Sequence, residues 1–204
     1  MTVTPVRVAV LASGGGTNLQ ALLDGLKGAG SHTARVTRVI SNRSDAGALE
    51  RARQAGVPGL VLPDPASAEA YVEAIGDAQL VVLAGYLKLV PTGVVSRFPW
   101  RMINIHPALL PDFGGPGMYG IRVHQAVLAA GKKESGASVH YVTEEYDRGD
   151  VIARARVPVL AGDSAETLAA RVLTAEHRLL PHVVTVLSLM GLPNHAVRLE
   201  DLDA

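Results

Sequence analysis

Residues 6–26 read VRVAVLASGGGTNLQALLDGL, and this stretch decides the fold class. An apolar run at residues 6–11 ends in a glycine cluster, which is typical of a buried parallel strand. Residues 17–26 carry leucines three and four positions apart, which predicts a helix. A strand, a glycine turn and a helix in this order form the first unit of an α/β protein.

The same alternation continues through the first half of the chain. Further apolar strands are expected at residues 36–41, 60–62 and 80–84, with helices at 46–55 and 68–75. Strands that alternate with helices predict parallel βαβ units with right-handed crossovers.

The second half has a different pattern. A strand at residues 102–106 runs into a loop rich in proline and glycine at 107–120, and ordered loops of this length are usually functional. The remaining elements are expected as a helix at 123–130, strands at 137–142 and 151–159, and a helix from 164 to about 190. The short acidic turn between the last two strands predicts an antiparallel pair. Asp163 with Glu166 predicts a capping box for the last helix, and Pro181 predicts a break in it.

These patterns predict a Rossmann-like α/β fold with a mixed, mostly parallel sheet flanked by helices. No linker divides the sequence, so residues 1–204 are interpreted as a single domain with two halves, 1–100 and 101–204.

Composition excludes several classes of protein. Lysine and arginine total 19, as do aspartate and glutamate, and the absence of a basic run argues against a general nucleic-acid binder. There is no cysteine, which excludes disulfides and thiolate chemistry. We find no signal-peptide pattern and no apolar stretch long enough for a membrane helix, so a cytoplasmic protein is expected.

The glycine loop at residues 13–18 predicts a phosphate site. Backbone N–H groups and the positive end of the following helix both favour an anion. A dinucleotide fingerprint fails, because Leu19 stands where its third glycine belongs and no acid ends the second strand. No Walker lysine follows either. The loop is therefore interpreted as a site for a simple phosphate ester, the alternative being a tight turn that needs glycine only for its backbone angles.

Asn104 and His106 lie two residues apart on a predicted strand, so their side chains share a face. An amide can stabilise an oxyanion and an imidazole can move protons. The alternative for His106 is a structural, hydrogen-bonded residue. A carboxylate partner is needed, and the acidic turn offers four candidates: Glu144, Glu145, Asp147 and Asp150.

Other polar residues have two interpretations each. Ser138 and His140 lie two residues apart on the strand expected at residues 137–142, so their side chains share a face and can line the same cleft. A core role for His140 is equally open. Glu176 lies in the apolar stripe of the last helix, so it binds either a polar ligand group or a nearby arginine. The histidines show no metal-ligand spacing, and no metal is expected.

Four segments occur in the order found in one family: SGGGTNLQ at 13–20, LAGYL at 83–87, NIHPALLP at 104–111 and DRGDVI at 147–152. Over residues 6–184 the chain resembles the phosphoribosylglycinamide formyltransferases, a branch of the folate-dependent formyltransferases. The resemblance implies the formyltransferase fold, with a phosphate-binding half at 1–100 and a catalytic and folate half at 101–204. It also implies transfer of the formyl group of 10-formyltetrahydrofolate to the amine of glycinamide ribonucleotide, in de novo purine biosynthesis, by a monomer or homodimer without metal.

The resemblance also assigns residues. Asn104 and His106 match the catalytic pair, and Asp147 matches the acid that keeps the imidazole protonated. Glu176 matches the contact to glycinamide. The residues that match the phosphate site are Gly16, Thr17 and Asn18. Those that match the formylfolate pocket, besides Asn104, are Leu87, Lys88, Leu89, Val90, Val142, Thr143 and Glu144.

The chain departs from the family at Ala68, where a basic residue is common, at Asp150, which replaces a common proline, and in a longer loop at 113–120. The alternatives to this function are formyltetrahydrofolate hydrolase, methionyl-tRNA formyltransferase and a non-catalytic sensor of a phosphate ligand.

Overall fold

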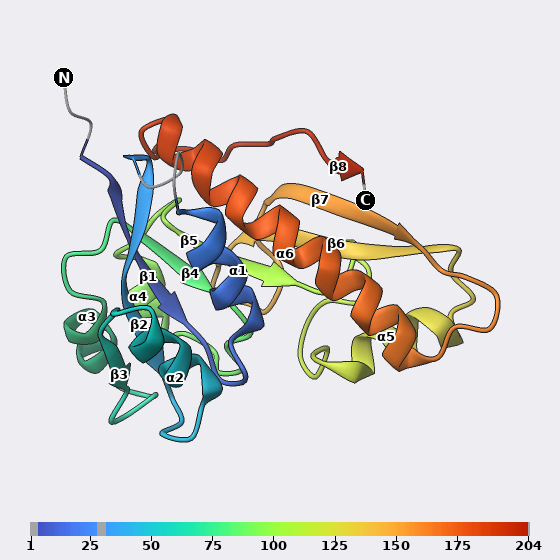
Figure 1. Ribbon diagram of the computed structural model, residues 1–204, viewed down its shortest axis with the longest axis horizontal. Coiled ribbons are helices and arrows are strands. Elements are labelled where there is room, and N and C mark those ends of the chain that lie inside the picture. Colours follow the sequence, from blue (N-terminus) through green and yellow to red (C-terminus); the bar gives the residue numbers. More distant parts are fainter. Residues whose placement is uncertain (1–3, 28–31, 204) are drawn as a thin grey trace.

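A computed structural model describes residues 4–27 and 32–203 (Figure 1). Within them eight strands form one sheet in the order β3-β2-β1-β4-β5-β6-β7-β8. The strands are β1 Val6–Leu11, β2 Ala34–Ser41, β3 Gly59–Val61, β4 Leu80–Leu83, β5 Met102–His106, β6 Glu134–Tyr141, β7 Val151–Pro158 and β8 Leu202–Asp203. Strands β1 to β5 pair in parallel, β6 runs antiparallel to both β5 and β7, and β8 is parallel to β7. The predicted mixed, mostly parallel sheet is confirmed.

Helices cover both faces of this sheet. They are α1 Thr17–Gly25, α2 Gly47–Gln54, α3 Ala68–Ile75, α4 Thr92–Val95, α5 Ile121–Ala129 and α6 Ala165–Leu189. Along β1, Val8 and Val10 pack in the core that includes α1 and α6, whereas Ala9 and Leu11 pack in the core that includes α3 and α4. Because alternate residues of a strand point to opposite faces, a strand between two helical layers must be apolar on both.

The last helix differs from the sequence prediction in two ways. Helix α6 continues unbroken past Pro181, which packs against α1 at Gly25, where a Cβ would lie 2.6 Å from the proline Cβ. Its capping box is formed by Ser164 and Thr167, so the predicted Asp163 and Glu166 pair is wrong. Asp163 instead forms an ion pair with Arg171, in which Oδ2 lies 2.6 Å from Nη1.

Two short elements have no signal in the sequence. Helix α4 has four residues and β8 has two, and neither is long enough to show a hydrophobic period. They form through tertiary contacts: Val94 of α4 is fully buried in the core beside α3, and β8 pairs with β7 at Ala155 and Arg156.

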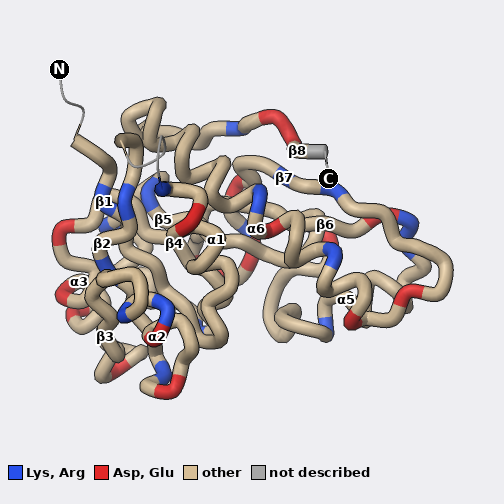
Figure 2. Tube along the Cα trace, viewed as in Figure 1, with Lys and Arg blue, Asp and Glu red and all other residues tan. Residues whose placement is uncertain are grey.

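Basic and acidic residues are interspersed along both halves of the chain (Figure 2). No helix among the described residues is long and apolar enough to cross a membrane.

The glycine loop is held from behind by helix α2. Gly16 has a φ of 73°, and a Cβ there would lie 2.7 Å from the Cα of Ala48. The backbone N–H of Ala48 donates to the Gly14 carbonyl at 3.1 Å. Arg51 Nε donates to the Gly15 carbonyl at 2.7 Å. The loop therefore needs glycine at position 16 both for its backbone angle and for this close approach.

We predict that Gly16→Ala lowers the free energy of unfolding by about 2–4 kcal/mol, because it adds a left-handed backbone cost to an overpacked contact. Gly14→Ala is the matched control, since Gly14 is not in the left-handed region and a Cβ there meets nothing within 4 Å. Urea unfolding of both variants measures the difference. Equal stability of the two would contradict this description of the loop.

Candidate active site

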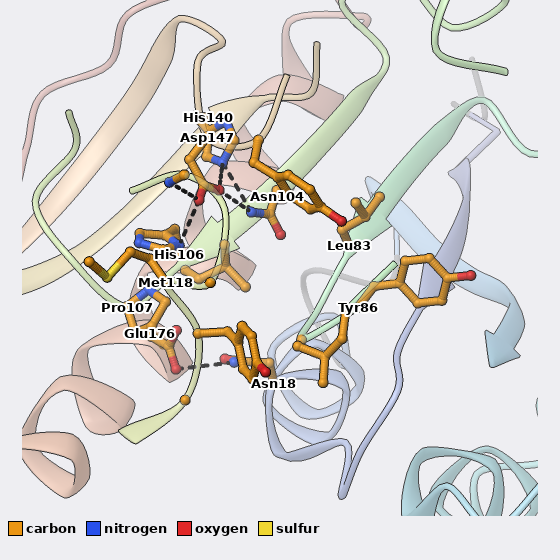
Figure 3. Close-up of a pocket in the computed structure, with 18 of the residues that line it drawn as sticks. Asn18, Leu83, Tyr86, Asn104, His106, Pro107, Met118, His140, Asp147 and Glu176 are labelled. Atoms are coloured by element: carbon orange, nitrogen blue, oxygen red, sulfur yellow. Dashed lines mark hydrogen bonds and ion pairs between the residues drawn. The ribbon is translucent and has the colours of Figure 1, made fainter. Parts of the chain in front are cut away.

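A cavity of about 700 Å³ lies at the carboxyl ends of β4 and β5 (Figure 3). Its walls come from the segment after β4, the loop at 113–120, the turn after β6 and one face of α6. Ligands of α/β proteins bind at this end of the strands, beyond their carboxyl termini.

Strand β5 delivers Asn104 and His106 to the cavity. The antiparallel register sets Asn104 opposite His140 and His106 opposite Ser138 on β6. Residues directly opposite each other point to the same face of a sheet. The Ser138 hydroxyl donates to the Ala108 carbonyl at 2.7 Å and accepts from the Leu110 N–H at 3.0 Å, so it fixes the chain that leaves β5.

Of the four acids in the turn after β6, Asp147 is the one that reaches this pair. Its φ of 56° turns the chain so that a side chain 9% exposed enters the cavity. The carboxylate accepts from the Gly115 N–H at 2.9 Å and from Asn104 Nδ2 at 3.4 Å. The nearest nitrogens of His106 and His140 lie 3.5 and 3.4 Å away.

Glycines let the surrounding loops close on this carboxylate. A Cβ on Gly149 would overlap the Tyr141 carbonyl, and one on Gly114 would lie 3.0 Å from the Cβ of Asp147. Any larger residue at either position pushes the turn away from the strands.

Opposing effects act on the pKa values of Asp147 and His106. Burial opposes ionisation of Asp147, but the neighbouring His140 side chain, the charge of His106 and the Gly115 N–H together hold its pKa below the usual value. Burial also lowers the pKa of His106, although Asp147 and the Phe113 carbonyl act in the opposite direction. The expectation that Asp147 keeps His106 protonated stays a prediction: the carboxylate acts in that direction, and burial acts against it.

The loop at 113–120 engages the imidazole directly. His106 Nε2 lies 2.9 Å from the Phe113 carbonyl, which only accepts, so this nitrogen carries a hydrogen. Phe113 has a φ of 56°, which brings its carbonyl back toward β5.

The opposite end of the cavity holds Glu176 and Asn18. Glu176 on α6 is 7% exposed, and Asn18 Nδ2 of α1 donates to its Oε2 at 3.2 Å. The alternative of an arginine partner for Glu176 is wrong: an amide cannot neutralise the charge, and burial raises the pKa of Glu176 to about 7. Within the described part of the chain, no group bonds to the buried Asn18 Oδ1.

Most other predicted site residues lie on the cavity wall. Those that line it are Leu87, Lys88, Leu89, Val90, Val142 and Thr143. Glu144 does not line it, and Glu145 and Tyr146 do. Gly16 and Thr17 stand at the start of α1 beside Asn18 but outside the wall.

Sequence reasoning missed several wall residues, among them Tyr86, Met118 and His124. His124 had a detectable signal, since it faces inward on α5 in step with Val127. Ala68, where the chain departs from the family, does not line the wall. No group of three potential metal ligands occurs among residues 4–27 and 32–203, and the expected absence of a metal stays a prediction.

Comparisons with known proteins identify a family for this chain. The profile of the family described as Formyl transferase matches residues 6–184. An Arabidopsis thaliana protein named as a chloroplastic phosphoribosylglycinamide formyltransferase is 45% identical over 87% of this chain, which spans 64% of that relative, less than two thirds of its length. The Escherichia coli phosphoribosylglycinamide formyltransferase is 43% identical over 88% of this chain and 86% of its own.

A solved structure is also similar. The crystal structure of phosphoribosylglycinamide formyltransferase from Anaplasma phagocytophilum superposes with a TM-score of 0.83 at 36% identity, covering 92% of this chain and 89% of that one.

We predict a pH dependence of stability from Glu176. Its pKa is raised in the folded protein from 4.5 to about 7, so the folded state keeps a proton that the unfolded state has lost. The resulting stabilisation is complete below about pH 4.5 and disappears as the pH rises through 7, a loss of about 3 kcal/mol. Glu176→Gln cannot ionise and should show a correspondingly smaller fall between pH 5 and 8 in urea unfolding. The exposed wall residue Glu145, changed to Gln, is the control; identical pH profiles for all three proteins would refute the assignment.

Proposed function

The chain belongs to the formyl transferase family, and from that premise we propose that it transfers the formyl group of 10-formyltetrahydrofolate to the primary amine of glycinamide ribonucleotide, in purine biosynthesis. The observation that carries the proposal is the meeting of Asn104, His106 and Asp147 at one end of a cavity whose other end holds Asn18 and Glu176. The named relatives support the choice of substrates.

The cavity, of about 700 Å³, lies within the usual size range of small-molecule sites. The phosphate of the ribonucleotide is assigned to the start of α1 at Gly16, Thr17 and Asn18, because the first backbone N–H groups of a helix have no partner within it and can bind an anion. The acceptors of Glu176 and Asn18 suit the N–H and O–H donors of the same substrate. The formylfolate is assigned to the apolar wall formed by residues 87–90 and by Val142 and Thr143.

The reaction is direct transfer. The amine attacks the formyl carbon, a C–N bond forms, and the carbonyl electrons move to oxygen. Asn104 and His106 donate hydrogen bonds to this oxyanion. The bond from the carbon to the folate nitrogen then breaks, and the proton released by the amine ends on that nitrogen. Growing negative charge beside His106 favours its protonated form, which Asp147 stabilises from the other ring nitrogen.

The loop must release the imidazole for this step. Because His106 Nε2 donates to the Phe113 carbonyl, the formyl oxygen has to replace that carbonyl as the acceptor. This assigns a role to the loop at 113–120: it occupies the oxyanion position until the substrate arrives.

Two alternatives are separated by one assay. Hydrolysis uses water as the acceptor, and a non-catalytic phosphate sensor turns nothing over. Spectrophotometric assay of a formylfolate analogue with and without glycinamide ribonucleotide distinguishes them: dependence on the ribonucleotide supports transfer, equal rates support hydrolysis, and no reaction supports the sensor.

The absence of a metal and a cytoplasmic location are proposed on the sequence alone, while two plant relatives are named as chloroplastic.

We predict that His106→Ala and Asp147→Asn each lower kcat by at least about 10²-fold, the effect of losing one oxyanion donor or its partner. Calorimetry should show that both variants still bind the formylfolate analogue. Asp150→Asn is the matched control, because Asp150 is an exposed acid of the same turn. Turnover near that of the unmodified protein in His106→Ala or Asp147→Asn would overturn the assignment.

A further inference from the structure

We propose that His140 is a positioning residue for the transfer reaction: it accepts one N–H of the Asn104 amide and thereby aims the second N–H into the cavity. The inference rests on the proposed function, because it assigns that second N–H to the formyl oxygen.

The backbone brings the two side chains together. Asn104 and His140 are directly opposite in the antiparallel β5–β6 ladder, so their side chains share a face. The β6–β7 ladder shifts register between Val139 and His140, an irregularity of the kind that re-aims side chains beside active sites. His140 is 2% exposed, and its ring meets the amide of Asn104 (Figure 3).

Hydrogen bonds select one form of the His140 ring. Its Nδ1 lies 2.8 Å from the Tyr141 carbonyl, which only accepts, so Nδ1 carries a hydrogen. In the neutral ring Nε2 is then an acceptor, and it lies 3.0 Å from Asn104 Nδ2, which only donates. One neutral tautomer satisfies both contacts, and in it Asp147 Oδ1, which lies 3.4 Å from Nε2, takes its hydrogen from Asn104 Nδ2 and not from the ring.

The geometry leaves one amide hydrogen unused. Asn104 Nδ2 lies 3.0 Å from His140 Nε2 and 3.4 Å from Asp147 Oδ1, and these two acceptors are 3.4 Å apart. By the law of cosines they subtend about 65° at Nδ2, whereas two N–H bonds of a planar amide diverge by about 120°. When one N–H points at His140 Nε2, the shorter contact, the second therefore lies at least about 55° from the direction of Asp147 Oδ1, too far off line for a hydrogen bond. The second points away from them and is free to meet the formyl oxygen.

Asp147 cannot fix the amide alone. Its contact with Asn104 is long for a hydrogen bond and shares the hydrogen that His140 accepts. Without His140, the amide can turn its nitrogen fully toward Asp147 or present its oxygen to the cavity, and either motion removes the aimed donor.

The first test is independent of activity. Nitrogen-15 NMR of the protein without substrates should show His140 with a protonated Nδ1 and an unprotonated Nε2, and a scalar coupling across the hydrogen bond between Asn104 Nδ2 and His140 Nε2. A hydrogen on Nε2, or loss of the coupling in a folded sample, would overturn the proposal. The result stands whether or not the protein transfers formyl groups, so it separates this inference from the proposed function.

The second test is kinetic. His140→Met removes the acceptor and should lower kcat by about 10- to 100-fold, the effect of a misplaced catalytic group. His140→Gln returns an acceptor and should restore most of the loss, and KM values for both substrates should stay within about twofold. In an Asn104→Ala background, His140→Met should cause no further loss of kcat. Equal fold-losses in both backgrounds would show a merely structural role and contradict the proposal.

Discussion

The carboxylate of Asp147 imposes the constraint on which the site depends. A buried charge is stable only where polar groups compensate it. Here the Gly115 N–H and the Asn104 amide donate to the carboxylate, and ring nitrogens of His106 and His140 lie 3.5 and 3.4 Å from it. These groups come from β5, β6 and the loop at 113–120. Pairing one charge therefore fixes three segments relative to each other, and with them the wall of the cavity.

At the opposite end of the cavity, the buried carboxyl group of Glu176 has an uncharged partner. Glu176 is buried against an amide, which gives hydrogen bonding without neutralisation, so the carboxyl holds its proton to about pH 7. Their surroundings shift the pKa values of the two buried acids in opposite directions. The pKa of Asp147 is lowered, which favours the ionised form, and the pKa of Glu176 is raised, which favours the neutral form. One suits a partner for an imidazole that gains charge, and the other suits recognition of a polar substrate.

Much of this arrangement could be read from the sequence. The apolar run of β1 and the leucine spacing of α1 predict the layers, and the spacing of Asn104 and His106 predicts a shared face. Periodicity alone could not choose Asp147 among four acids, because the choice depends on a left-handed backbone angle and on glycines at 114 and 149. It also could not show that the Phe113 carbonyl occupies His106 Nε2, or that burial would lower the pKa of His106, since both depend on how the loop folds over the strand.

The central claim is that Asn104, His106 and Asp147 surround the formyl group during transfer. A crystal structure with glycinamide ribonucleotide and an unreactive formylfolate analogue tests it directly. The account predicts the formyl oxygen within hydrogen-bonding distance of Asn104 Nδ2 and of His106 Nε2, with the Phe113 carbonyl moved away. A formyl group bound elsewhere, with the Phe113 carbonyl still on His106, would contradict it.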